Sequence, residues 1–303
     1  MLNFALIIFC IAAGMVLRTA KLIPEGAHKG INAWIIYVAL PAAALKYIPK
    51  IPWSIDVMFA VAAPALVWLG SWLLFTALAK WKKWQPKLQH TLELGGGFSN
   101  TSFVGFPLVI AYFGEQYLSI AIICDQVMFI LLSTIGIIAA QKGGDNKGNK
   151  TGAMVIVKKL VTFPPFIACV LALVLAPLVS FSSVEPFLDK MSSTVAPLAL
   201  FSVGLQLSFK GWTKDLPHIS LAIFYKLLMA PTLVLLAALM FGLKGMVAKI
   251  SVFEAAMPTV VTSSIIAEQY GLNTKLLNLI IGISILLGLL TTGVWYYILA
   301  ATL

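Results

Sequence analysis

The sequence predicts an all-α polytopic membrane protein with ten transmembrane helices, arranged as two inverted repeats of five helices each. Three observations lead to this prediction. Hydrophobic residues make up 60% of the 303-residue chain and charged residues only 11%, about half of the charged share in soluble proteins. The apolar residues fall into runs long enough to cross a bilayer. Short motifs recur between the two halves of the chain, and one run in each half is interrupted.

Runs of about 20 apolar residues are the sequence signature of membrane helices. The first run has no basic segment ahead of it, so we expect a retained helix and not a signal peptide. The linker at 141–152 is polar and separates a first repeat, 1–140, from a second, 153–303. The ten expected spans are 1–17, 30–48, 55–79, 91–113, 116–139, 154–181, 190–208, 217–242, 246–269 and 275–302.

The basic residues divide unequally between the two sides of these spans. Fifteen Lys and Arg residues fall on the side of the linker and five on the other. Because cytoplasmic loops carry the excess of positive charge, we expect the linker in the cytoplasm and both termini outside the cytoplasmic (inner) membrane. This topology also accounts for the net charge of +10, and no nucleic-acid partner is expected because no such motif is present. The five residues expected outside are Lys46, Lys50, Lys190, Lys244 and Lys249.

The stretch Gly95–Gly114 is apolar enough to enter a bilayer, yet it carries a run of polar residues. Pro107 lacks an N–H group and would clash with the carbonyl four residues back, so we expect the helix to break near Phe103, with Gly105 and Pro107 as helix-breaking residues. Broken backbone at membrane depth is tolerated only where protein or a watery cavity receives it. The sequence therefore predicts a functional site in this stretch.

An internal repeat gives this break a counterpart in the second half. Gly114 and Gly271 end similar motifs at an offset of 157, which places Asn100-Thr101 opposite Met257-Pro258. A second match, at an offset of 160, pairs residues 39–45 with 199–205. These matches favour inverted repeats whose broken fourth and ninth helices meet near the midplane, as in many secondary transporters.

The two interruptions supply the candidate substrate-binding residues. Free N–H groups and the dipole at a helix end can receive a carboxylate. The alternative is that these side chains only satisfy backbone groups or neighbouring helices, or fill a proline kink. The candidates are Ser99, Asn100 and Thr101 in the first interruption and Met257, Pro258 and Thr259 in the second.

Charged residues inside the spans are candidates for charge balance or ion coupling. Lys226 lies too deep in the eighth span to reach the interface, and ionisable groups at such depth are functional candidates. Asp125 and Glu254 are its possible partners; the alternative is a fixed structural ion pair. Glu93 and Glu268 lie nearer the cytoplasmic ends, where we expect solvated positions.

Enzyme signatures are absent from the sequence. The chain has no metal-ligand spacing, no phosphate-binding loop and no nucleophile elbow. Gly95-Gly96-Gly97 does not link a strand to a helix, so it indicates close packing or bending. We expect no enzyme activity, no metal and no cofactor.

The motifs resemble those of the auxin efflux carrier family, which includes plant PIN auxin transporters and bacterial malate or malonate permeases. Residues 100–108 read Asn-Thr-Ser-Phe-Val-Gly-Phe-Pro-Leu and are similar to the family's Asn-Thr-x-x-x-Gly-x-Pro-Leu crossover. Ala256-Met257-Pro258, leading to Ala267-Glu268-Gln269-Tyr270, resembles the ninth-helix crossover. Lys226 followed by Pro231 is similar to a basic residue and proline in the eighth helix of relatives. Residues 37–42 and 199–205 resemble its second and seventh helices, so the likeness covers nearly the whole chain.

The resemblance implies a fold akin to bile-acid symporters and sodium/proton antiporters. It further implies a scaffold domain (helices 1, 2, 6 and 7), a transport domain (helices 3–5 and 8–10), elevator-type movement, a homodimer, and contact between Asn100 and a substrate carboxylate. One departure concerns the ligand. Plant members open helix six with Asn-Pro-Asn-Thr, whereas this chain has Phe163-Pro164-Pro165-Phe166, so a small organic anion is the expectation and not auxin itself.

The sequence thus predicts a secondary active or facilitative transporter of a small organic anion that works by alternating access. One alternative is a sodium- or proton-coupled symporter in which Asp125 or Glu254 binds the ion. An alternative of another class is a membrane sensor that binds a ligand without net transport.

Overall fold

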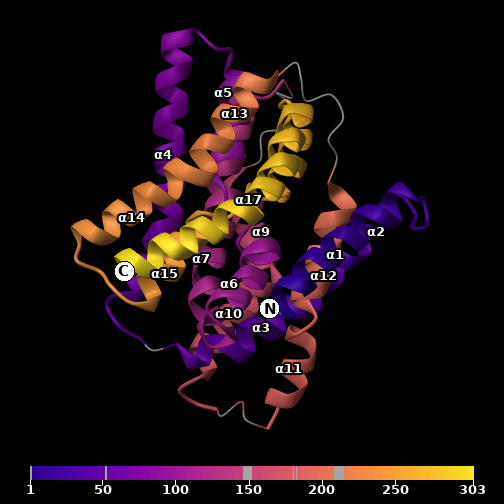
Figure 1. Cartoon of the computed structure of the whole chain (residues 1–303), viewed down its shortest axis with the longest axis vertical. Coiled ribbons are helices and arrows are strands. Elements are labelled where there is room, and N and C mark those ends of the chain that lie inside the picture. The colour runs from indigo at the N-terminus through magenta and orange to yellow at the C-terminus, as the bar shows by residue number, and fades with distance from the viewer. Residues whose placement is uncertain (1, 52, 146–151, 180, 182, 208–214) are drawn as a thin grey trace. The chain divides into compact units, whose positions relative to one another are not determined.

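The computed structural model describes residues 2–51, 53–145, 152–179, 181, 183–207 and 215–303. Over these residues the chain is helical, apart from turns and one isolated antiparallel β-bridge between Ser99 and Thr259. The helices can be followed by label in Figure 1. Residues 146–151 of the expected linker lie outside the described residues.

Five helical stretches are long and apolar enough to cross a membrane. They are Ala27–Lys50, Val57–Lys82, Glu115–Gly143, Leu216–Met240 and Thr274–Thr302. A sixth span results if Met154–Val161 and Pro164–Leu175, bent by 64°, are taken together. Shorter apolar helices cover Asn3–Thr19 and Thr101–Tyr112. These lengths and compositions are those of an all-α polytopic membrane protein.

The fourth and ninth expected spans are also divided into shorter helices. The fourth expected span contains α5 (Pro86–Gly97) and then, after three non-helical residues, the helical segment Thr101–Tyr112, which ends in α6 (Phe106–Tyr112). The ninth contains α15 (Met246–Ala255) and α16 (Thr262–Tyr270), separated by residues 256–261. Pro258 lies in this second gap.

The first of two compact units comprises Met1–Trp53, Ser102–Ile122 and Val157–Leu207, so it draws on both halves of the chain. Helices α1 and α12 pack with their backbones in contact, because a Cβ atom on Gly14 would lie 2.4 Å from the Phe201 carbonyl oxygen. Small residues permit such close approach in membrane helices. Its helices are α1 (Leu2–Thr19), α2 (Ala27–Trp34), α3 (Leu40–Tyr47), α6, the end of α9 (Ala153–Val161), α10 (Pro164–Leu175), α11 (Glu185–Ser192) and α12 (Val195–Gln206).

The second unit comprises Ser54–Thr101, Ile123–Ile156 and Ser208–Leu303. It contains both interruptions and therefore the candidate site. Its helices are α4 (Val57–Lys82), α5, most of α7 (Leu118–Leu131), α8 (Ile137–Gly143), α13 (Leu216–Phe224), α14 (Ala230–Met240), α15, α16 and α17 (Thr274–Thr302).

Three prolines stand just after π-helical turns instead of breaking their helices. A π turn bonds each N–H to the carbonyl five residues back, which shifts the hydrogen-bond ladder and accommodates a residue without an N–H. The pairs are Ile35–Ala39 with Pro41, Thr101–Gly105 with Pro107, and Tyr225–Met229 with Pro231.

Regular helix does fail within Gly95–Gly114 as expected, but Gly105 and Pro107 were wrongly predicted as the breaking residues. Gly105 ends the π turn with a helical backbone, φ −63° and ψ −52°, and Pro107 is the second residue of α6. The helix is interrupted earlier, at 98–100, where Phe98 adopts extended backbone angles. The physical reason is that the widened turn absorbs the proline, so neither Gly105 nor Pro107 breaks the helix.

Candidate functional site at the helix crossing

The two interruptions meet inside the second unit. The Asn100 N–H donates to the Pro258 carbonyl over 2.7 Å, and the Val260 N–H donates to the Phe98 carbonyl over 3.0 Å. Together with the bridge between Ser99 and Thr259, these bonds form a short antiparallel ladder. Each extended segment thereby satisfies backbone groups of the other, as buried backbone requires.

Hydroxyl groups on both segments fasten the crossing to its surroundings. The Thr259 hydroxyl donates to the Gly95 carbonyl over 2.6 Å, and the Thr259 N–H donates to the Ser284 hydroxyl over 3.2 Å. The Thr101 hydroxyl donates to the Asp125 carboxylate over 2.5 Å. Thr101 and Thr259 are therefore engaged in holding the site, and both are buried.

Asn100 and Ser99 differ from these threonines because their side chains retain unused hydrogen-bonding capacity. The Asn100 side chain is 1% exposed, and its Nδ2 has no hydrogen-bond partner among the described residues. The buried Ser99 hydroxyl also has no hydrogen-bond partner among the described residues. Since buried polar groups are nearly always satisfied, such orphans call for an explanation. Both groups can donate to an acceptor such as a carboxylate oxygen.

The three charged residues expected inside the spans lie near this crossing. Lys226 is fully buried and donates to the Ala255 carbonyl over 2.7 Å, at the carboxyl end of α15. A cation is favourable at that end of a helix dipole. Glu254 lies within electrostatic range of both Lys226 and Asp125. Lys226 is thus held by a carbonyl and not by the direct ion pair with Glu254 that was one alternative.

Glu254 is 2% exposed, and neither carboxylate oxygen has a hydrogen-bond partner in the described part of the chain. It borders a narrow gap at the crossing that has no room for a water molecule. The polar residues along this space are Ser99, Thr101, Cys124, Ser251 and Glu254. The arrangement can hold a proton or a small cation at Glu254.

The glycine triplet allows α5 to carry the first interruption into a tightly packed place. A Cβ atom on Gly96 would lie 2.8 Å from the Phe75 ring and 2.9 Å from both the Ser71 hydroxyl and the Tyr225 ring. Gly95 faces Ile280 at 3.2 Å. The close packing expected for this triplet is present.

The sequence reasoning missed a polar cluster on α5. Glu93, expected in a solvated position, is 2% exposed. Its carboxylate lies 2.7 Å from His90 Nδ1 and accepts hydrogen bonds from the Gln89 amide at 3.0 Å and the Thr76 hydroxyl at 3.3 Å. The expectation was wrong because the nearby partners, including one on α4, replace water. The spacing of Gln89, His90 and Glu93 on one helical face was the available signal.

Comparisons with known proteins agree with this helical membrane architecture. A family model described as membrane transport protein matches residues 1–296. An uncharacterized transporter from Methanocaldococcus jannaschii is 25% identical over 97% of both chains. A putative malonate transporter from Rhizobium meliloti is 26% identical, over 94% of this chain and 92% of the relative. Auxin efflux carrier component 5 of Arabidopsis thaliana is 22% identical, over 82% of this chain and 81% of the relative.

The match to the family model extends over nearly the whole chain, and the relatives align from end to end with it. The resemblance to the auxin efflux carriers expected from the crossover motifs is confirmed. The chain belongs to the family of membrane transport proteins that includes the auxin efflux carriers, and it is a transporter and not an enzyme.

Proposed function

We propose that this protein carries a small organic anion across the cytoplasmic membrane by elevator-type alternating access, as a secondary active or facilitative transporter. One observation carries the proposal. The Asn100 side chain is buried at the crossing of two interrupted helices, and its Nδ2 donor has no partner among the described residues. A carboxylate oxygen is the natural acceptor for such a donor.

Positive electrostatic features reinforce this choice of ligand. The helical segment that begins at Thr101 and helix α16, which begins at Thr262, both start at the crossing. Helix N-termini attract anions through their free N–H groups and dipole. Lys226 adds a buried positive charge nearby. Ser99, Thr101, Met257, Pro258 and Thr259 would complete the wall of the site.

The substrate class rests on the relatives as well as on the site. One relative is named as a putative malonate transporter and others as auxin efflux carriers, and their substrates share a carboxylate. Helix α10 opens with Pro164 and Pro165, without the amide side chains expected of an auxin site. We therefore favour a small carboxylate, with dicarboxylates as the first compounds to test.

The finer architecture is part of the same proposal. We propose ten membrane helices in two inverted repeats, with helices 1, 2, 6 and 7 as scaffold and helices 3–5 and 8–10 as transport domain. Both termini would lie outside and the linker 141–152 in the cytoplasm, with two copies forming a homodimer. The apolar stretches and the two interruptions support this arrangement.

The test is carboxylate binding by the purified protein. A ligand that binds only the folded state raises the melting temperature, so thermal shift across mono- and dicarboxylates identifies a ligand. In Asn100→Ala the dissociation constant should rise roughly 10- to 100-fold, because a hydrogen bond to a charged group contributes about 1.5–3 kcal/mol. Uptake into proteoliposomes should fall in parallel.

Asn278→Ala is the matched control, since Asn278 is an exposed asparagine of the same unit, on α17, that accepts a hydrogen bond from Ser264. It should leave the dissociation constant unchanged. Carboxylate binding that is equally tight in Asn100→Ala and the parent protein would remove Asn100 from the site.

A proton- or sodium-coupled form of the same transport is a second candidate, favoured by Glu254. Both of its carboxylate oxygens are free of hydrogen-bond partners within the described residues. A carboxylate with free oxygens at the crossing can load a proton or cation on one side of the membrane and release it on the other. Asp125, which accepts the Thr101 hydroxyl, would link this group to the binding segment.

A further inference from the structure

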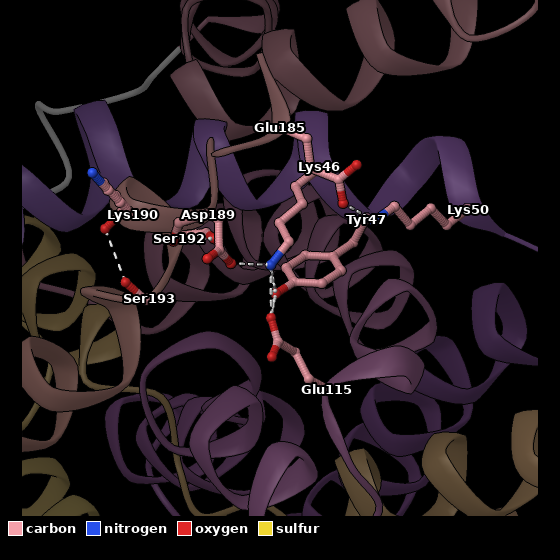
Figure 2. A network of polar contacts seen from close by, with 9 residues as sticks. All are labelled: Lys46, Tyr47, Lys50, Glu115, Glu185, Asp189, Lys190, Ser192 and Ser193. Atoms are coloured by element: carbon pink, nitrogen blue, oxygen red, sulfur yellow. Dashed lines mark hydrogen bonds and ion pairs between the residues drawn. The ribbon is translucent and has the colours of Figure 1, made fainter. Parts of the chain in front are cut away.

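A buried lysine of the first unit joins three segments that are distant in sequence (Figure 2). Lys46 Nζ donates to Asp189 Oδ1 over 2.5 Å, to Glu115 Oε1 over 2.7 Å and to the Tyr47 hydroxyl over 2.9 Å. The Tyr47 hydroxyl in turn donates to Glu115. Lys46, which the sequence placed only among the outer basic residues, is 8% exposed.

The position of Glu115 gives this network its meaning. Lys46 and Tyr47 end α3, and Asp189 belongs to α11. Glu115 comes three residues after the end of α6, the outer part of the interrupted helix, and follows Gly114, whose φ of +100° favours glycine. The segment Ser102–Ile122 packs within the first unit, although the chain on both sides of it belongs to the second. Any movement between the units must therefore act on this segment.

The three charges are arranged so that Glu115 can leave at little cost. The side chains of Glu115 and Asp189 are 53% and 57% exposed, whereas that of Lys46 is 8% exposed. A buried ammonium without a partner would be strongly destabilising. When Glu115 departs, however, Lys46 keeps Asp189, and the Glu115 carboxylate can be hydrated. Two carboxylates for one lysine make the contact releasable.

Space for water is present next to the lysine. A cavity of about 250 Å³ is lined by Lys46, Lys50 and Glu185 together with apolar residues. Since a water molecule occupies about 30 Å³, this cavity can hold several molecules that hydrate the ammonium while Glu115 is away.

The other repeat has no equivalent lysine. The offset of 160 that aligns residues 39–45 with 199–205 places Gln206 opposite Lys46. Among the described residues, the Gln206 amide donates within its own helix, to the Ser202 carbonyl at 3.0 Å and hydroxyl at 3.1 Å. The Lys46 contact therefore has no ionic counterpart at the equivalent position of the second repeat. Such an asymmetry is expected of a contact that stabilises one of the two conformations related by the inverted repeats.

We propose that Lys46 and Glu115 form a reversible latch that holds the segment Ser102–Ile122 against the rest of the first unit, and that the transport cycle includes a step in which Glu115 leaves Lys46 while Asp189 stays. Lys46 is in this sense a positioning residue for the outer part of the interrupted helix. The release of Glu115 during the transport cycle rests on the proposed transport function, whereas the latch itself does not.

Hydrogen exchange tests the latch without any substrate. In Glu115→Gln, which keeps the side-chain volume, backbone amides of 112–118 should exchange about tenfold faster, because a charge-assisted contact is lost. Glu185→Gln is the matched control: Glu185 pairs with Lys50 over 2.5 Å on the same side of the unit but does not touch the segment. Unchanged exchange in Glu115→Gln, or an equal increase in Glu185→Gln, would overturn the latch.

A reversible cross-link tests the release step. In a background without the buried cysteines Cys10, Cys124 and Cys169, none of which forms a disulfide, Lys46→Cys/Glu115→Cys is joined by a bifunctional thiosulfonate reagent. Carboxylate flux should fall at least tenfold and return on reduction, whereas the same reagent on Lys50→Cys/Glu185→Cys should leave flux unaltered. Full flux through the cross-linked 46/115 protein would refute the release step. If the parent protein transports no carboxylate, the proposed function fails, and the exchange experiment still decides the latch.

Discussion

Exchanging Glu254 for Gln and Lys226 for Met separates charge balance from packing at the crossing. Glu254→Gln replaces a buried carboxyl group whose oxygens make no hydrogen bond in the described part of the chain. Lys226→Met removes a buried positive charge together with its hydrogen bond to the Ala255 carbonyl. Methionine retains most of the length and volume of the lysine stem, so the cavity contribution is small.

The structure fixes the expected order of the effects. Lys226→Met leaves the Ala255 carbonyl unsatisfied, which costs about 1–3 kcal/mol, and also deprives Glu254 of a nearby cation. Two unit charges 4 Å apart interact by about 4 kcal/mol at an effective dielectric constant of 20. Because Lys226 contacts the carbonyl and not the carboxylate, we expect a smaller coupling of about 1–3 kcal/mol between Lys226 and Glu254. Glu254→Gln loses no hydrogen bond and should be the milder single variant.

The assay is a double-mutant cycle on melting temperature in detergent. For a chain of this size, 1 kcal/mol corresponds to a shift of about 2 °C. The double variant should be more stable than the sum of the single effects predicts, because neither charge is left alone. In proteoliposomes, flux through Glu254→Gln should no longer respond to an imposed pH gradient. Additive effects within about 0.5 kcal/mol, together with a flux that still follows the gradient, would refute this reasoning.

Two further predictions concern packing and pH. Gly96→Ala should lower the free energy of unfolding by about 1–3 kcal/mol, because the added Cβ would lie 2.8 Å from the Phe75 ring. Gly97→Ala should change the free energy of unfolding by less than about 1 kcal/mol, because the nearest contacts of its Cβ would be 3.4 Å away. Equal melting temperatures for the two variants would contradict this geometry. The hydrogen bond from Lys46 holds the pKa of Asp189 below its ordinary value. The contribution of this carboxylate is therefore present above its unfolded pKa and is lost only as the pH falls through the lower folded pKa. The difference in melting temperature between Asp189→Asn and the parent should thus be the same at pH 7 and pH 5, and a difference that disappears by pH 5 would contradict the assignment.

The helical membrane architecture and the approximate place of the crossing could be predicted from the sequence, because both follow from local patterns. Apolar runs determine where helices lie, and the polar residues at 99–101 mark the first interruption. The exact point of interruption could not be predicted, because a π turn depends on hydrogen bonds shifted by one residue. Pro107 looked like a break for that reason and proved to belong to a continuous helix.

Charged groups were harder to place than apolar ones. Lys46 and Glu93 look alike in sequence, since each lies near the end of an apolar run where water is expected. Both are buried because partners replace that water: Glu115 and Asp189 are 69 and 143 residues away from Lys46, and Thr76 is 17 residues away from Glu93. Pairings over such separations are decided by the tertiary fold and leave no periodic trace. The hydrogen bond from Lys226 to the Ala255 carbonyl at the end of α15 is likewise decided by the tertiary fold.

The crossing also explains how a broken helix can leave a side chain free for a ligand. Helix ends usually recruit Asn, Ser or Thr side chains as caps, which would engage Asn100 itself. Here α16 begins without a side-chain cap at Val261, and the end of α5 is served from the opposite segment, where the Thr259 hydroxyl donates to the Gly95 carbonyl. The exposed backbone groups are satisfied by the opposite segment, through Pro258 and Phe98 as acceptors. Since Pro258 needs no partner for an N–H, this reciprocal pairing needs few side chains, and Nδ2 of Asn100 is left without a hydrogen-bond partner among the described residues.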